Sequence, residues 1–261
     1  MESVRDLPPL RKSTVWSGPS CGTCPIRSNA VCSLCNREEF ELLEQIKSYR
    51  TFRPGEKIAT AGHSIEYVAS VVSGIAVIRQ DHPDGRRSIL GFLFPSDFLG
   101  RPGREQYPFD IDANSEVCLC CFRRKDFDAI LRRCLSINRR LLEMTLDELD
   151  AARMWMSVLG RTNSRERISS LLILILEHQS RLNRTPVGEA ADFSLPITRE
   201  EAADFLGLTL ETVSRRLSDL KSEGIIEFGG VRRIHIPCLE SLLSETGDPA
   251  VWRDRLSRAN A

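Results

Sequence analysis

The sequence lacks the long apolar runs that span membranes. Its longest apolar runs reach six residues, as at 171–176, whereas a membrane-spanning helix needs about 18 or more. Residues 1–14, MESVRDLPPLRKST, also lack the apolar stretch of a secretory signal peptide. We therefore expect a cytoplasmic protein that does not bind a membrane.

Net charge is lacking too, because 36 Lys and Arg balance 36 Asp and Glu. The whole molecule has no electrostatic preference for nucleic acid, so any such binding must depend on a local surface. The four histidines are scattered, and the sequence contains no Ser/His/Asp set and no phosphate-binding loop. These absences argue against an enzyme. The chain has 261 residues, 41% of them hydrophobic, which is enough for two packed domains.

Cysteine, by contrast, is abundant. Four of the nine cysteines form the pattern Cys21-x2-Cys24-x7-Cys32-x2-Cys35. A reducing compartment disfavours disulfides, and an odd total would leave one cysteine unpaired. Metal or cluster ligation is therefore the better interpretation. The four cysteines could bind zinc by themselves, although the gap of seven residues is short for a zinc ribbon. Thiol redox chemistry also stays open, but no βαβ pattern surrounds either CxxC pair.

Residues 36–132 have the pattern of a small β domain that follows an arm over residues 1–35. A short amphipathic helix is predicted over residues 36–49. Short β-rich runs follow, separated by turn signals such as Arg53-Pro54-Gly55 and Pro83-Asp84-Gly85. Regularly spaced short strands of this kind predict an antiparallel roll.

Residues 133–160 carry a heptad repeat. Leucine or methionine recurs every seventh residue from Leu135, and a second series follows three positions later. The pattern predicts one long helix, which could pack on its own domain or pair with a second chain. The sustained repeat favours pairing, and the predicted homodimer interface consists of Leu142, Leu149, Ala152, Met156 and Leu159.

Residues 161–245 are predicted to form a winged helix-turn-helix, followed by a tail over residues 246–261. Thr198 and Glu201 have the spacing of a capping box that begins one helix, and Gly207 ends it. Thr209 caps a second helix over residues 210–222, and a two-strand hairpin turns at Gly229 and Gly230. In this motif the second helix enters the major groove of DNA.

The second helix presents side chains suited to reading bases. Arg215 can donate twice to guanine, Glu211 can accept from cytosine, and Ser214 can lie against a thymine methyl. Thr212 also faces outward, and Arg216 could meet a phosphate. Residues 194–236 carry six Lys or Arg against seven Asp or Glu, so nonspecific affinity should be modest and a dimer would help. A helical domain that binds a protein partner is the alternative.

These motifs together resemble the CRP/FNR superfamily of bacterial transcription regulators, across nearly the whole chain. The matching stretches are FRPGE at 52–56, SGIAVI at 73–78, the long helix, and ETVSRRLSDLKSEGII at 211–226. The resemblance implies an α+β fold: an N-terminal antiparallel β-roll like that of cyclic-nucleotide-binding domains, a long dimerisation helix and a C-terminal winged helix-turn-helix. It also implies a homodimer that binds a palindromic operator in double-stranded DNA and contacts RNA polymerase.

The resemblance is more specific within the FNR branch. The E-x-x-S-R pattern of Glu211, Ser214 and Arg215 is the recognition-helix signature of that branch, whose members read TTGAT-type half-sites. The N-terminal cysteine spacing is similar to that of the FnrL/FnrN group of alphaproteobacterial oxygen regulators. This similarity implies an activator or repressor of anaerobic and microaerobic genes. The alternative is a regulator of the same family that depends on zinc or thiol redox chemistry.

The FNR resemblance also implies a [4Fe–4S] cluster, which cysteine thiolates hold. Its expected ligands are Cys21, Cys24 and Cys32, with a fourth cysteine from the stretch EVCLCCF. Alignment of Val117-Cys118 and the downstream Phe122 with the family pattern selects Cys118. Cys120 and Cys121 are then expected to be small core residues.

Relatives that bind cyclic AMP carry Gly-Glu and a later Arg-Ser or Arg-Thr to hold the ribose and phosphate. In residues 97–109 of this sequence Arg101 stands in place of the glutamate, and no Arg-Ser or Arg-Thr follows. The ribose hydroxyl would find no acid, so the sequence argues against a cyclic nucleotide as ligand.

Overall fold

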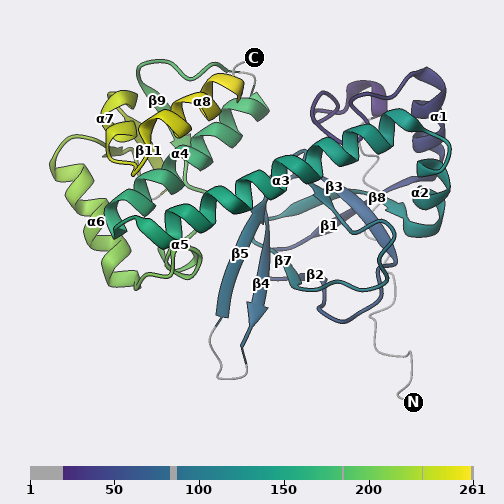
Figure 1. Cartoon of the computed structure of the whole chain (residues 1–261), viewed down its shortest axis with the longest axis horizontal. Coiled ribbons are helices and arrows are strands. Elements are labelled where there is room, and N and C mark those ends of the chain that lie inside the picture. Colours follow the sequence, from purple (N-terminus) through teal and green to yellow (C-terminus); the bar gives the residue numbers. More distant parts are fainter. Residues whose placement is uncertain (1–19, 83–86, 184, 231, 260–261) are drawn as a thin grey trace.

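The computed structural model describes residues 20–82, 87–183, 185–230 and 232–259. The turn predicted at Pro83-Asp84-Gly85 and nearly all of the arm before the cysteines lie outside these residues. Figure 1 shows the roll at one end of a long helix, α3, and the C-terminal helices at the other. No helix among the described residues is long and apolar enough to cross a membrane.

The helices predicted from the sequence are present, and the structure adds one helix between the roll and the long helix and two at the C-terminus. A single 3-10 turn covers Cys21–Thr23 within the cysteine segment. The helices are α1 (Arg37–Ile46), α2 (Arg124–Leu131), α3 (Leu135–Arg161), α4 (Ser164–Asn183), α5 (Arg199–Leu206), α6 (Leu210–Ser222), α7 (Leu239–Ser244) and α8 (Pro249–Ala259). The residues expected to be a tail therefore include an ordered helix, α8, whose Trp252 and Leu256 are buried.

The roll consists of two four-stranded antiparallel sheets, with strand orders β1-β8-β3-β6 and β2-β7-β4-β5. Its strands are β1 (Lys47–Phe52), β2 (Lys57–Ala59), β3 (Tyr67–Ser73), β4 (Ala76–Asp81), β5 (Arg87–Leu93), β6 (Phe98–Leu99), β7 (Asp110–Ala113) and β8 (Val117–Arg123). Gly74 joins β3 to β4 at φ 79°, and a Cβ there would meet the Glu116 carbonyl oxygen at 2.0 Å. The turn therefore requires glycine.

The predicted helix over residues 36–49 ends earlier than expected. Asn36 and Glu39 form a capping box that begins α1. The Lys47 amide still bonds to the Leu43 carbonyl, but Lys47 itself is extended and begins β1, which pairs with β8. Helical periodicity cannot reveal such an end, because pairing with a strand some 70 residues away decides it.

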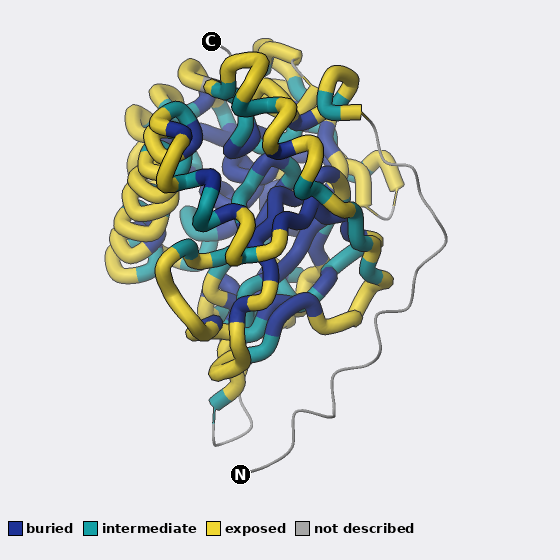
Figure 2. The backbone as a smooth tube through the Cα atoms, turned by 90° about the vertical axis from the view of Figure 1, so that its right-hand side faces the viewer, coloured by how far each residue is buried: buried dark blue, intermediate teal, exposed yellow. Residues whose placement is uncertain are grey.

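The described residues form two hydrophobic cores. In Figure 2 the buried stretches of the backbone, in dark blue, gather in the interior. The first lies between the sheets of the roll and includes Ile26, Ala30 and Val31 of the cysteine segment (residues 21–35). The second fills the C-terminal domain (residues 161–245, hereafter the reader) around α4. The cysteine segment is therefore packed onto the roll.

The hairpin of β4 and β5 joins the two domains. Val77 and Ile89 belong to the core of the reader. The Phe92 ring meets Phe205 of α5 at a centroid distance of 5.1 Å, and Arg79 lies 3.4 Å from Glu201. Helix α5 of the reader is thus held against a hairpin of the roll.

The reader has the predicted winged helix-turn-helix topology. The strand β9 (Ala191–Ser194) precedes helices α5 and α6, and β10 (Glu227–Phe228) and β11 (Arg233–Ile236) follow them. The three strands form one sheet in the order β10-β11-β9. The predicted hairpin is β10 and β11, and β9 adds a third strand that was not predicted from the sequence. The expected α+β class is confirmed.

Candidate functional site

The turn between α5 and α6 is built by the residues that the sequence indicates. The Thr198 hydroxyl accepts from the Glu201 amide at 3.1 Å, and the Glu201 carboxylate accepts from the Thr198 amide at 2.7 Å. Gly207 ends α5 at φ 62°, a left-handed conformation that favours glycine. The Thr209 side chain caps α6 by accepting from the Thr212 amide at 3.1 Å. The start of α6 is therefore fixed relative to α5.

The predicted DNA-reading residues divide into two groups on α6. Glu211 and Arg215 are exposed, and Ser214 is half-buried beside them. Thr212 bonds through its hydroxyl to Thr209 at 2.8 Å, which makes it part of the cap. Arg216 donates to the Ser164 hydroxyl at 3.0 Å and pairs with Asp219. Arg216 therefore connects α6 to the start of α4, a role that the sequence did not suggest.

Two further arginines support the recognition helix and were missed from sequence. Arg199, exposed at the start of α5, donates to the Ser214 hydroxyl at 3.4 Å and so places a cation beside the reading surface. Arg165 of α4 bonds Glu223 at 2.7 and 2.5 Å and also pairs with Glu245. The role of Arg199 could have been predicted from the sequence, because it directly follows Thr198, the residue that caps α5. The contacts of Arg165 could not, because they depend on tertiary packing.

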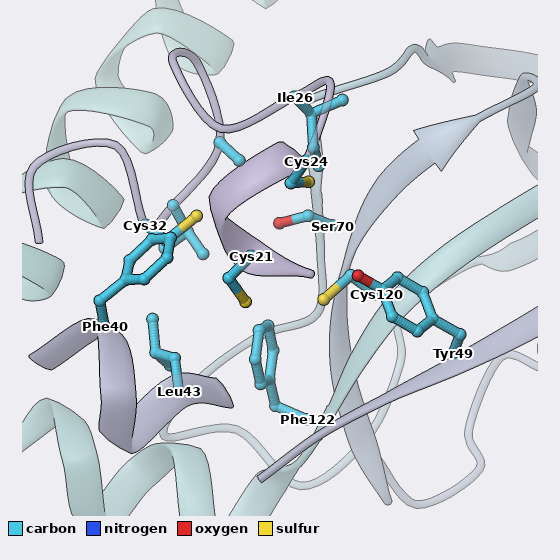
Figure 3. A pocket seen from close by; sticks show the side chains of 12 residues that line it. Cys21, Cys24, Ile26, Cys32, Phe40, Leu43, Tyr49, Ser70, Cys120 and Phe122 are labelled. Atoms are coloured by element: carbon cyan, nitrogen blue, oxygen red, sulfur yellow. The ribbon is translucent and has the colours of Figure 1, made fainter. Parts of the chain in front are cut away.

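A second site lies where the cysteine segment meets the roll. Three cysteines of the segment and one cysteine of β8 line a single small cavity: Cys21, Cys24, Cys32 and Cys120. The other walls are largely apolar and include Ile26, Phe40, Leu43 and Phe122. Figure 3 shows these side chains converging from the segment, α1 and β8. The structure thus brings together the three N-terminal cysteines that the sequence selects.

The fourth cysteine is placed less simply. Cys118 and Cys120 share one face of β8, as alternation predicts, with Thr51 and Tyr49 of β1 as their cross-strand partners. Both are buried, but it is Cys120 that lines the cavity, next to Cys21 and Cys24. The selection of Cys118 remains a prediction. Cys120 and Cys121 belong to the buried core of the roll, as expected, and Cys120 also lines the cavity.

Cys35 lies apart from the cavity. Burial raises the pKa of its thiol to about 12, and its neighbours include Ser136, Glu39 and Cys134, at the junction with α3. Cys35 does not line the cavity with the other three cysteines of the segment. A zinc site made by the four N-terminal cysteines alone would need Cys35 to turn inward.

Burial disfavours the thiolate form of Cys21 and Cys32 in the cavity wall and of Cys118 on β8. Burial raises the pKa of Cys32 to about 11 and that of Cys118 to about 11. Burial also raises the pKa of Cys21, against the opposing effect of the Lys47 ammonium, whose Nζ lies 3.2 Å from the Cys21 sulfur. A metal or cluster bound here must therefore displace protons from the thiols.

The donor set fits an iron–sulfur cluster in its chemistry. Cysteine thiolates are the usual ligands of such clusters, and a largely apolar wall limits solvent access. Across the described ranges, no three His, Cys, Asp or Glu side chains are close enough to hold a metal ion as they stand. Binding would therefore require the cysteine side chains to turn toward one another.

Helix α3 carries an apolar stripe that no other part of the described chain covers. Leu135, Leu142, Leu146, Leu149 and Met156 are all exposed, and we call them the seam face. Ala152 is exposed beside them, whereas Leu159 packs partly against the core of the reader. Four of the five predicted interface residues are thus available to a second chain.

Comparison with known proteins identifies the class. A model described as a Crp-like helix-turn-helix domain matches residues 166–244, and one described as a cyclic nucleotide-binding domain matches residues 49–134. The chain is 49% identical over 228 residues to the transcriptional activator protein FnrL of Cereibacter sphaeroides, covering 87% of this chain and 92% of that protein. It is 32% identical to the nitrogen fixation regulation protein FixK of Bradyrhizobium diazoefficiens, covering 87% and 94%.

The same class emerges from solved structures. The structure of FixK2 from Bradyrhizobium japonicum superposes with a TM-score of 0.69 at 30% identity, covering 77% of this chain and 98% of that one. The chain belongs to the CRP/FNR family of transcription regulators. It is a DNA-binding regulator of the FNR/FixK activator type and not an enzyme.

Proposed function

We propose that this regulator senses oxygen through a [4Fe–4S] cluster and, as a homodimer in the cytoplasm, binds TTGAT-type palindromes to control anaerobic and microaerobic genes. The observation that carries the proposal is that Cys21, Cys24 and Cys32 line one largely apolar cavity. Its β8 wall includes Cys120, which lies on the same face of the strand as Cys118. The relative FnrL, at 49% identity, is described as a transcriptional activator.

Cys21, Cys24 and Cys32 would hold the cluster from the segment, and Cys118 would hold it from β8. When bound, a [4Fe–4S] cluster supplies an oxygen-labile connection between these two parts of the chain. The segment packs against the roll beside α3, so fixing the segment favours one position of that helix. Leu142, Leu149 and Met156 of two chains would then pair along the seam face.

The dimer matters because a single reader binds DNA weakly. Two chains place two α6 helices about one helical turn apart on a palindrome, which doubles the contacts. Glu211, Ser214 and Arg215 would read bases. Arg199, and Arg232, which is exposed just before β11, would meet phosphates. A chain whose cysteine segment is released from β8 would dimerise less and leave the operator. Contact between the DNA-bound dimer and RNA polymerase would give activation.

The alternative is a regulator that uses zinc or thiol oxidation at the same cysteines. Purification without air separates the two proposals. We expect about four iron and four sulfide per chain, a broad visible absorption that bleaches in air, and parallel loss of binding to a TTGAT-type palindrome in gel-shift titrations. A colourless, zinc-loaded protein that binds the palindrome equally in air would overturn the proposal.

A further inference from the structure

The first half of α3 is fastened directly to the cysteine segment. Arg140 extends from α3, and its Nη2 donates to the main-chain carbonyl of Asn29 at 2.8 Å. Asn29 lies between Cys24 and Cys32, in the part of the segment that turns from one to the other. The Arg140 side chain is only 21% exposed, so this charge-assisted bond is partly shielded from water.

Arg140 lies on the side of α3 that faces away from the seam. Leu142 follows it by two positions, which is a rotation of about 200° around the helix. The neighbouring residues Ile137, Leu141 and Met144 pack against the core of the roll. Apolar packing of this kind allows small shifts of a helix. A directed hydrogen bond to one carbonyl, by contrast, fixes the rotation of the helix about its axis and its position along that axis.

A second contact joins the same turn of α3 to the helix that follows the segment. Ser136 donates to the Glu39 carboxylate, and Glu39 also accepts from the Asn36 amide at 3.0 Å as part of the α1 cap. Cys35 lies beside Ser136. Asn29, in the middle of the segment, and Glu39, in α1, are therefore bonded to residues that lie one turn apart on α3.

We propose that Arg140 is the positioning residue through which the cysteine segment sets the seam face of α3 for dimerisation. This inference rests on the proposed function, because it is the occupied cysteine site that fixes the segment. With the segment fixed, the Asn29 carbonyl holds Arg140, and Leu142 and Leu149 face a second chain in register. With the segment displaced, that carbonyl moves, and α3 keeps its apolar contacts with the roll and the bond from Ser136 to Glu39.

The test compares Arg140→Met with Arg139→Met, using full-length protein purified without air. Both substitutions keep an unbranched stem and remove one positive charge. Arg139 is a matched control because its side chain is 77% exposed and pairs only with Glu143 in the described part of the chain. Iron and sulfide are assayed first, and dimer dissociation is then measured by sedimentation velocity without air.

We expect all three proteins to contain equal iron and sulfide. Arg140→Met should raise the dimer dissociation constant roughly tenfold, the size expected for losing one charge-assisted hydrogen bond, and Arg139→Met should match the parent. Unchanged dimerisation of Arg140→Met at full cluster content would overturn the inference and leave the proposed function standing.

A second measurement needs no cluster. In the iron-free protein, hydrogen exchange of residues 21–35 should accelerate in Arg140→Met and stay at the parent rate in Arg139→Met, because the segment loses its bond to α3. Equal exchange in all three proteins would contradict the inference. If none of the three contains iron and sulfide, the proposed function fails, and this exchange result alone decides whether Arg140 holds the segment.

Discussion

Two neighbouring arginines of α6, Arg215 and Arg216, have different roles in the structure. Arg215 is exposed on the first turns of α6, whereas its neighbour Arg216 is bonded to Ser164 and Asp219. The two arginines were predicted together from sequence because both face away from the apolar side of the helix. Only tertiary packing distinguishes the one that is available to DNA from the one that holds α6 to α4.

We expect Arg215→Ala to weaken binding to a TTGAT-type palindrome by roughly 1–3 kcal/mol per half-site, because its bidentate contact to guanine is lost. Gel-shift titration at fixed salt measures the change. The control is Arg258→Ala, since Arg258 is exposed on α8 and pairs with Asp254. Equal affinity of the two variants for the palindrome would contradict the role assigned to Arg215.

His178 is a second residue whose surroundings give a measurable consequence. Its ring stacks on Phe94 at a centroid distance of 4.0 Å, at the contact between α4 and the roll. Burial, assisted by Arg181 and Arg255, lowers the pKa of His178 to about 3. The unfolded chain binds a proton near pH 6.5 and the folded chain does not. Stability is therefore full above that pH and falls as the pH drops toward 3.

Lowering the pH from 7.5 to 5.5 should reduce the parent's free energy of unfolding by roughly 1 kcal/mol, because His178 takes up a proton only in the unfolded chain. The variant His178→Phe keeps a ring against Phe94 and cannot titrate there. Its free energy of unfolding should therefore fall less than the parent's over this pH interval, by about 1 kcal/mol. Urea unfolding at the two pH values measures both proteins. An identical pH dependence in the variant would show that folding does not lower the pKa of His178.

At the scale of elements, the seam face of α3 is the part of the account most open to direct test. Leu149 is 43% exposed within the stripe, and Leu182, near the end of α4, is 38% exposed outside it. The two leucines have similar exposure, but we expect a second chain to cover Leu149 and not Leu182. Leu182 is therefore a suitable control. The heptad spacing predicted this stripe, and the structure confirms that most of it faces outward.

Leu149→Gln should weaken the dimer by roughly 1–3 kcal/mol, because each chain loses an apolar side chain from the interface. Leu182→Gln should leave association unchanged. Sedimentation velocity without air compares the two with the parent at several protein concentrations. Dissociation constants that rise equally in both variants would place the interface elsewhere.

The sequence predicts elements well where local signals decide them and less well where distant contacts do. The caps at Thr198 and Thr209 and the left-handed Gly207 lie where the motif requires them. The switch from α1 to β1 at Lys47, the third reader strand β9 and the helix α8 were missed. Each of these depends on partners far along the chain, which periodicity cannot report.

At the scale of the whole molecule, the structure connects the cysteine segment to the reader through continuous packing. The segment is bonded to α3 by Arg140, α3 continues into the reader, and the β4–β5 hairpin packs against α5. Which cysteines share a cavity could be predicted in part: three from their spacing, but the place of Cys120 only from the fold. A change at the cysteine site therefore has a physical route to the recognition helix.

The most direct test of the central claim compares Cys118→Ser, Cys120→Ser and Cys238→Ser with the parent. Cys238 serves as the control because it is exposed and lies on the reader. Iron, sulfide and sedimentation are measured without air and again after exposure to air. The account predicts that the parent, Cys120→Ser and Cys238→Ser hold the cluster and change from dimer to monomer in air, while Cys118→Ser lacks the cluster and is monomeric throughout. A Cys118→Ser protein that keeps both its cluster and its response to air would contradict the account.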